Sequence, residues 1–315
     1  MKRSIADVLR RGVLSTLANW PVILTRVVEM FVVFGVLVVA AVGLIVPMLV
    51  SAGVERWTLP TRGNGWEMML QILGEHAALF SYLLLFLAAI TLILVAVHAF
   101  VNAGAARIYV DAERAAPDAA QLRREQFAVF TLERWSAGAR AAWLPIFWIY
   151  NGAWSVAALI LLVPIAIAGA LTAWAVQAEN AAAIVGVTCG GIALLLVVGI
   201  PLALVVAIWV QKAVIICVAR GVAAPEALRS GWAESRADFL RHFVVFFLIG
   251  IVSAGAGSVL GSAFAPFSLI PHHHDWWSLL FGPMQIISFT LQSAAGNAVG
   301  CWLIACFAAM TRERP

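Results

Sequence analysis

Charged residues are scarce in this chain. Only 11% of its 315 residues are Asp, Glu, Lys or Arg, whereas 63% are hydrophobic and the mean hydropathy is +0.97. A soluble domain carries about 25% charged residues. Too few polar side chains remain to cover a water-facing surface, so the composition excludes a soluble globular protein. The apolar stretches recur without a linker rich in Pro, Ser or Gly, and we predict one membrane domain over residues 1–315.

Cysteine is also sparse, and catalytic signatures are lacking. The four cysteines lie in or beside apolar runs, none in a predicted external loop and none with C-x-x-C spacing, so we expect no disulfide. The chain has no H-E-x-x-H, G-x-S-x-G or P-loop motif, and no aspartate pair within a predicted span. We therefore expect no enzymatic activity, no bound metal and no cofactor.

Long apolar runs dominate what is present. A membrane-spanning helix needs about 20 apolar residues, and six segments reach that length. Continuous apolar runs predict helices and not the alternating strands of a barrel. The fold class predicted is therefore an all-α polytopic transmembrane bundle. Its predicted spans are residues 27–52, 77–101, 146–175, 182–210, 243–270 and 279–310.

The distribution of Lys and Arg predicts the topology. Of the 20 basic residues, 18 lie in the N-terminal segment, the second and fourth gaps and the tail, and the other two, Arg56 and Arg62, lie in the first gap. Basic residues accumulate on the cytoplasmic side of membrane proteins. We predict that both termini are cytoplasmic, that the first span is retained and that the protein resides in the bacterial inner membrane. A stripe of basic residues for nucleic acid is not indicated.

The stretch from Ala182 to Arg220 permits two interpretations. As one helix it is unusually long, and as two short spans it would place Arg229, Arg236 and Arg241 outside, against the charge rule. We prefer a single helix, kinked at Pro201, that leaves the membrane near Lys212.

An internal repeat links two segments 219 residues apart. Asp7–Trp20 and Glu226–Phe239 share acidic, leucine, arginine and glycine positions, and each precedes a predicted span. The matched polar and glycine residues are Asp7, Arg10, Gly12, Glu226, Arg229 and Gly231. A weaker third copy covers Phe130–Trp143. We interpret the segments as amphipathic interfacial helices before the odd-numbered spans, although any basic segment before a span shares some of these features.

The segment from Glu226 to Trp232, "EALRSGW", follows a helix end and a small turn and leads into a span. This arrangement resembles the cytoplasmic junction of bacterial six-span proteins of unassigned function. They include the YciC-like proteins and the membrane domain attached to some glycerophosphodiester phosphodiesterases. About 35 residues carry the resemblance. It implies a six-span membrane domain and transfers no catalytic residue.

Small residues recur every four positions in the last two predicted spans. One ladder is Ser253, Gly257 and Gly261, and the sixth span adds Gly296 and Gly300. Such ladders let helix backbones approach closely. We predict packing within the bundle, with contact to a second subunit as the alternative.

Polar residues within the predicted spans are few. Gln292 and Asn297 lie near the middle of a span, and we expect them to form interhelical hydrogen bonds. Glu29, His98, Asn151 and Lys212 lie near span ends, where we expect solvation or pairing. His272 and His274, in a predicted external loop, are weak candidates for metal binding, because four consecutive polar residues rarely provide convergent ligands.

Three functions stay open. The first is a non-catalytic protein that organises or assists other membrane components through helix packing, with a membrane-protein partner or a homo-oligomer besides the lipid bilayer. The second is a transporter or permease for a lipid or another hydrophobic molecule, which requires a cavity between repeats. The third, an intramembrane enzyme, requires convergent polar groups that the sequence does not reveal.

Overall fold

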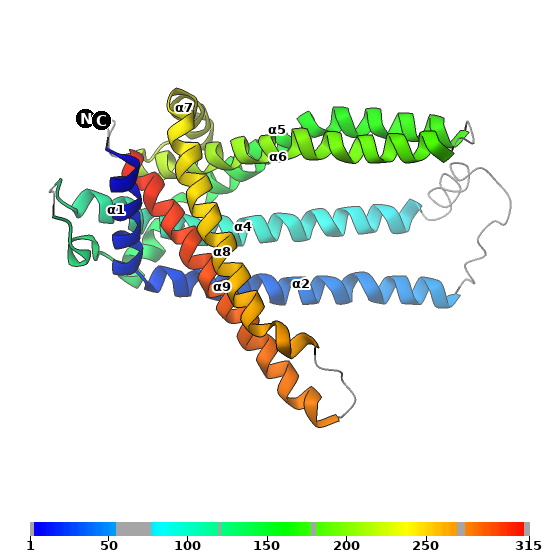
Figure 1. Cartoon of the computed structure of the whole chain (residues 1–315), viewed down its shortest axis with the longest axis horizontal. Coiled ribbons are helices and arrows are strands. Elements are labelled where there is room, and N and C mark those ends of the chain that lie inside the picture. The colour runs from blue at the N-terminus through cyan, green and yellow to red at the C-terminus, as the bar shows by residue number, and fades with distance from the viewer. Residues whose placement is uncertain (1–2, 55–76, 119–120, 178–180, 270–274, 312–315) are drawn as a thin grey trace. The chain divides into compact units, whose positions relative to one another are not determined.

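Helices account for all the regular structure that the computed structural model describes, which covers residues 3–54, 77–118, 121–177, 181–269 and 275–311 (Figure 1). Over these ranges there are eight α-helices and one short 3₁₀-helix, η1 (Arg124–Phe127), without any strand. The predicted all-α class is therefore confirmed.

Six of the helices are long and apolar enough to cross a membrane, as predicted. The shortest has 31 residues, about 46 Å at 1.5 Å per residue, which exceeds the thickness of a bilayer's hydrocarbon core. Their outward apolar side chains are widely exposed; Leu85, for example, is 73% exposed. The six helices are α2 (Pro21–Val54), α4 (Ala77–Ala115), α5 (Leu132–Gln177), α6 (Ala181–Arg220), α8 (Phe239–Leu269) and α9 (Asp275–Thr311).

The prediction of one helix through Pro201 is confirmed, because α6 runs unbroken from Ala181 to Arg220. Its end is defined by Gly221, which adopts a positive φ of 68° and whose N–H bonds to the carbonyl of Cys217 at 2.9 Å. Glycine adopts this left-handed conformation without steric cost and is a common helix terminator.

Two short helices, α1 (Ile5–Ala18) and α7 (Ala224–Ala237), directly precede α2 and α8. Ser4 caps α1 by accepting a hydrogen bond from the N–H of Asp7 at 3.1 Å. Asn19 and Asp238 then end the two helices in non-helical conformations. In the described chain between α4 and α5, only the short 3₁₀-helix η1 precedes the third span, and the separate α-helix expected for the third copy is not formed. Ala142 stands at the position of Asn19 in that alignment, and the α5 helix continues through it.

The chain forms two compact units. The first comprises residues 1–32, 96–150 and 208–315, and the second comprises residues 33–95 and 151–207. In the second unit, the ring of Phe86 packs against Gly43, and the hydroxyl of Tyr82 donates to the Gly43 carbonyl at 3.3 Å.

In the first unit, α8 and α9 run side by side, and α1 lies across α9 (Figure 1). Asn19 ties the end of α1 to the segment after η1. Its amide donates to the carbonyl of Phe127 at 2.8 Å, and its Oδ1 accepts from the N–H groups of Val129 and Phe130 at 3.1 and 3.0 Å. Asn19 is fully buried, so one side chain satisfies several backbone groups that water cannot reach.

Candidate functional site

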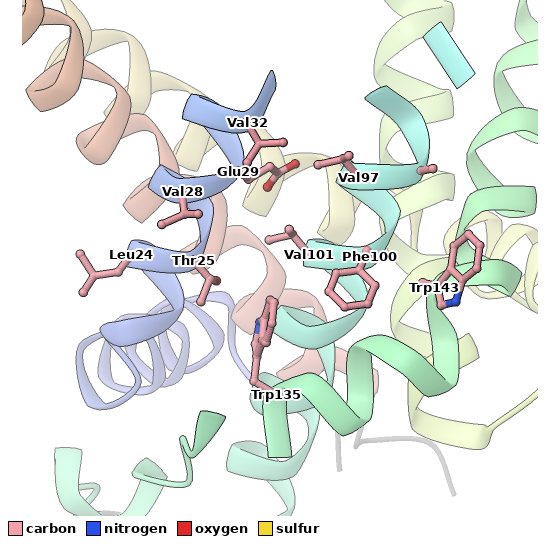
Figure 2. A pocket seen from close by; sticks show the side chains of 11 residues that line it. Leu24, Thr25, Val28, Glu29, Val32, Val97, Phe100, Val101, Trp135 and Trp143 are labelled. Atoms are coloured by element: carbon pink, nitrogen blue, oxygen red, sulfur yellow. The ribbon is translucent and has the colours of Figure 1, made fainter. Parts of the chain in front are cut away.

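An apolar cavity of about 760 Å³ opens in the first unit between α2, α4 and the start of α5 (Figure 2). We call it the groove. Figure 2 shows the side chains of α2 and α4 facing one another across it, with the indole of Trp135 below them. Its lining residues are Leu24, Thr25, Val28, Glu29, Val32, Ala96, Val97, Phe100, Val101, Trp135 and Trp143.

The helical repeat explains why these residues share one space. On α2 the lining positions recur at spacings of three and four, so they lie along one helix face. Trp135 completes the wall from α5, where its indole packs over Gly104 and meets Phe100 edge to face at 5.8 Å. The missing side chain at Gly104 therefore lets α5 approach α4 beside the groove.

A cluster of polar side chains borders the groove. Arg26 donates to Glu29 at 2.9 Å and to Asn102, and the Asn102 amide donates to the hydroxyl of Tyr150. Nδ1 of His98 lies 2.6 Å from the second oxygen of Glu29. All but the imidazole are buried, and the His98 side chain is 47% exposed. The polar cluster thus joins three helices through one chain of hydrogen bonds.

Among the described residues that line the groove, Glu29 is the only one with a charged side chain. Its carboxylate is bound on one oxygen by Arg26 and on the other by His98. The acidic and basic groups nearest the groove therefore satisfy one another. The surface that the groove offers is therefore almost wholly apolar, which suits a hydrophobic molecule.

The pairing expected for Glu29 and His98 is present, because Nδ1 of His98 lies against the Glu29 carboxylate. The structure also joins the two residues to Arg26, Asn102 and Tyr150, a cluster that the sequence does not reveal. A partial signal was present, since Arg26 and Glu29 are three apart and His98 and Asn102 are four apart, which puts each pair on one helix face. The neighbouring placement of the three helices was not readable from the sequence.

Lys212 is paired and not solvated, which is one of the two outcomes expected for a residue near the end of a span. It is 1% exposed, and its ammonium lies 3.1 Å from Glu234 of α7 and donates to Thr311 of α9 at 2.9 Å. Arg220 binds the other oxygen of Glu234 at 2.6 Å. Burial opposes the charged form of Glu234, but the two cations outweigh it and lower the pKa of that carboxyl below its ordinary value.

A second group of ion pairs holds the N-terminal segment. Arg11 is buried and lies 2.8 Å from Glu113 on α4, which also accepts from Arg3 at 2.7 Å. Arg3 further donates to the carbonyl of Ala309 at 3.1 Å. Burial disfavours the Arg3 cation, yet Glu113 and Asp118 raise the pKa of its guanidinium. The start of α1 and the ends of α4 and α9 therefore meet.

The predicted ladder residues do not approach a neighbouring helix closely. A Cβ atom built on Gly257, Gly261, Gly296 or Gly300 would meet no atom of the described chain within 4 Å. Ser253 on the same ladder is half-buried. No helix of the described chain packs closely on these glycines, so packing through the ladders stays a prediction.

The remaining candidates do not gather at the groove. Gln292 is exposed and donates to Ser288 of its own helix at 3.0 Å, and Asn297 is half-buried. His272 and His274 lie outside the described residues. Over the part of the chain that is described, no three His, Cys, Asp or Glu side chains converge as metal ligands.

The residues of the predicted repeat occupy equivalent positions in α1 and α7, which both have 14 residues and begin 219 residues apart. Gly12 and Gly231 are buried, and Arg10, Glu226 and Arg229 are exposed, with Asp7 half-exposed. Four of the five buried positions of each helix coincide at that offset. The coinciding pairs are Val8 with Ala227, Gly12 with Gly231, Ser15 with Glu234 and Thr16 with Ser235.

Comparisons with family models, with curated proteins and with solved structures found no match to this chain. The helices themselves define the class. Six apolar helices of membrane-spanning length make this a multi-pass membrane protein.

Proposed function

We propose that this protein binds a lipid or another hydrophobic small molecule in the groove, as a transporter or permease of that class. The observation that carries the proposal is the groove itself, a cavity of about 760 Å³ walled by apolar and aromatic side chains with one carboxylate. Ligand sites of this kind are mostly apolar and contain a few placed polar groups. Both tryptophans of the groove come from the start of α5, which the sequence aligns with the repeat as its third copy. The groove therefore also lies between that segment and the two spans, α2 and α4, that follow the first copy.

Binding without catalysis is the form of activity that we propose. An acid–base catalyst needs a proton-accepting or proton-donating group that is available to the substrate. Here Glu29 is held by Arg26 and His98, and Asn102 is held by Arg26 and Tyr150. These bonds suit a rigid wall better than a reacting group.

The experiment that tests the groove is native mass spectrometry of the protein released from lipid nanodiscs. Val97→Trp, which places an indole in the groove, should abolish retention of the bound lipid or hydrophobic molecule. The matched control is Val39→Trp on α2, where the side chain is 69% exposed and does not line the groove. Equal retention by both variants would refute groove binding, and flux measured in proteoliposomes then tests transport separately.

A second candidate is the organising or accessory role through helix packing. It is favoured by the small-residue positions on α8 and α9, where a Cβ atom would meet nothing within 4 Å. We propose that a membrane-protein partner or a second copy uses this face. Gly257→Leu with Gly261→Leu should then lower the oligomer or complex fraction in nanodiscs, while a native protein that is isolated as a monomer with no co-purifying membrane protein would refute this role.

We propose the bacterial inner membrane as the location, with both termini in the cytoplasm, and we retain the kinship with the six-span group as a proposal. The placement of 18 of the 20 basic residues supports this topology. The contacts of Arg3 with Glu113 and Ala309 also support it, because they bring three predicted cytoplasmic ends together. A green fluorescent protein fused to the C-terminus should fluoresce, and a dark, correctly inserted fusion would contradict the topology.

A further inference from the structure

A second cavity, of about 390 Å³, lies in the first unit where α4, the start of α5 and the end of α6 meet. It differs from the groove in its chemistry, because the described residues that line it include two arginines, Arg107 and Arg134, and neither Asp nor Glu. The same segment of α5, Arg134–Trp143, contributes to both cavities through different faces.

The stem of Arg107 is fixed by close packing. A Cβ atom built on Gly138 would lie 2.5 Å from both Cβ and Cγ of Arg107, so only glycine admits this approach. Nε of Arg107 donates to Asp111 one helical turn away at 2.9 Å. Among the described residues, the structure gives the two Nη groups of Arg107 no partner.

Arg134 approaches the same cavity from α5. It uses one Nη group to donate to the carbonyl of Val129 at 3.1 Å, a contact that orients the guanidinium without neutralising it. Asp111 already serves two cations, since Arg114 lies 3.8 Å away from its other oxygen. The one carboxylate of Asp111 therefore does not balance the three arginines, and the net charge of these four residues is positive.

Small residues keep the cavity open between these cations. The α5 wall consists largely of alanines and Gly138, and the far wall is the turn at Gly221, whose positive φ carries the chain out of α6. Pro145 and Val218 add apolar surface. The cavity thus combines two cationic groups from different helices with room for an organic substituent.

We propose that this cavity binds a phosphate group, carried either by an anionic phospholipid headgroup or by a soluble phosphate monoester. Planar guanidinium groups match the spacing of phosphate oxygens and form strong charge-assisted hydrogen bonds with them. Two such groups on separate helices can engage one phosphate anion, a monoester or a diester, from two sides. The site is separate from the groove, so its occupancy does not depend on the proposed groove ligand.

The test uses the full chain in nanodiscs and two measurements. Equilibrium dialysis in phosphatidylcholine nanodiscs measures binding of radiolabelled inorganic phosphate and glycerol phosphate. Native mass spectrometry from mixed phosphatidylglycerol and phosphatidylcholine nanodiscs measures retention of the anionic lipid. Binding in the first measurement identifies a soluble ligand, and retention in the second alone identifies a lipid headgroup; either result supports the phosphate site.

The variants are Arg107→Gln and Arg134→Gln, each expected to weaken binding about tenfold or more, as the loss of one charge-assisted hydrogen bond implies. Arg140→Gln is the matched control, because Arg140 is an exposed arginine of the same helix that does not line the cavity. Ala141→Leu, which fills the cavity without changing charge, should also abolish binding.

Val97→Trp in the groove should leave phosphate binding intact, which separates failure of this proposal from failure of the groove. The proposal is overturned if neither measurement detects binding by the native chain. It is equally overturned if the variant that combines Arg107→Gln with Arg134→Gln binds as tightly as the native chain, or if Arg140→Gln weakens binding as much as Arg107→Gln does.

Discussion

Gly12 and Trp302 are in direct contact where α1 lies on α9. A Cβ atom built on Gly12 would lie 2.8 Å from Cδ1 of the indole, whose Nε1 donates to the carbonyl of Leu9 at 3.1 Å. The equivalent position of α7 is Gly231, which packs on Ala213 of α6. Each short helix therefore rests, through a glycine, on a long helix that ends a predicted pair of spans.

The same contact occurs a third time with the residue types exchanged. In the alignment of the third copy, Trp135 stands at the position of Gly12, and its indole packs on Gly104 of α4. A large and a small residue thus trade places across the helix crossing. The third copy stays a prediction, since α5 does not break where α1 and α7 end.

The two glycines should differ in their tolerance of a methyl group. At Gly231 a Cβ atom would lie 2.9 Å from the backbone N and Cα atoms of Ala213, whereas at Gly12 the nearest atom, at 2.4 Å, is the side-chain sulfur of Cys306. Backbone cannot move aside as a side chain can, so Gly231→Ala should cost about 2 kcal/mol in the free energy of unfolding and Gly12→Ala less.

Gly255→Ala is the matched control for these two variants. A Cβ atom there meets nothing within 4 Å, and the gain in helix propensity should stabilise α8 by up to about 1 kcal/mol. Thermal unfolding in detergent, followed by circular dichroism, measures all three variants. Equal stability of Gly231→Ala and Gly255→Ala would contradict the packing described for α7.

Asn19→Ala should be strongly destabilising. The change leaves the backbone N–H groups of Val129 and Phe130 and the carbonyl of Phe127 without the side chain that binds them. Unsatisfied buried polar groups cost about 1–3 kcal/mol each, so a loss of about 3 kcal/mol is expected. Gln292→Ala removes an exposed amide and should change stability by less than about 0.5 kcal/mol in the same unfolding assay.

The contrast between Asn19 and Gln292 shows what the sequence revealed. Apolar length alone predicted six helices, because hydrophobic runs of that size have one stable form in a bilayer. Among the polar residues, depth along a single helix singles out Gln292, which is exposed and bonds only within its own helix in the described chain. Asn19 bonds to a segment more than a hundred residues away, and Tyr150 bonds to a residue nearly fifty residues away. Such pairings depend on how the helices pack together, which a single helix pattern does not reveal. The groove was likewise invisible, since its walls come from three separate helices.

The Arg26–Glu29 pair should show strong coupling between its two members. Arg26→Met leaves Glu29 buried with His98 alone, and Glu29→Met leaves Arg26 with Asn102, so each single change should cost about 3–5 kcal/mol. The double variant removes both charges and should be less destabilised than the sum of the single changes. Additive losses in a double-mutant cycle of unfolding free energies would show that the pair is not coupled.

The ion pairs of Glu234 should make the stability of the protein depend on pH. Because the pKa of its carboxyl is lowered in the folded protein from the ordinary value of 4.5, the ion pairs contribute their full stability above about pH 4.5. That contribution is lost as the pH falls through the lowered value. Glu234→Gln should cost about 3 kcal/mol at pH 7, since Lys212 is left buried without its carboxylate.

The same variant should lose less stability than the native chain when the pH is lowered from 7 to 3, since it has no carboxylate at this position to protonate. The matched control is Glu226→Gln, an exposed acid on the same helix, which should follow the native pH profile. Unfolding temperatures in detergent across this range measure the difference. Parallel pH profiles for Glu234→Gln and the native chain would contradict the role of Glu234 in acid sensitivity.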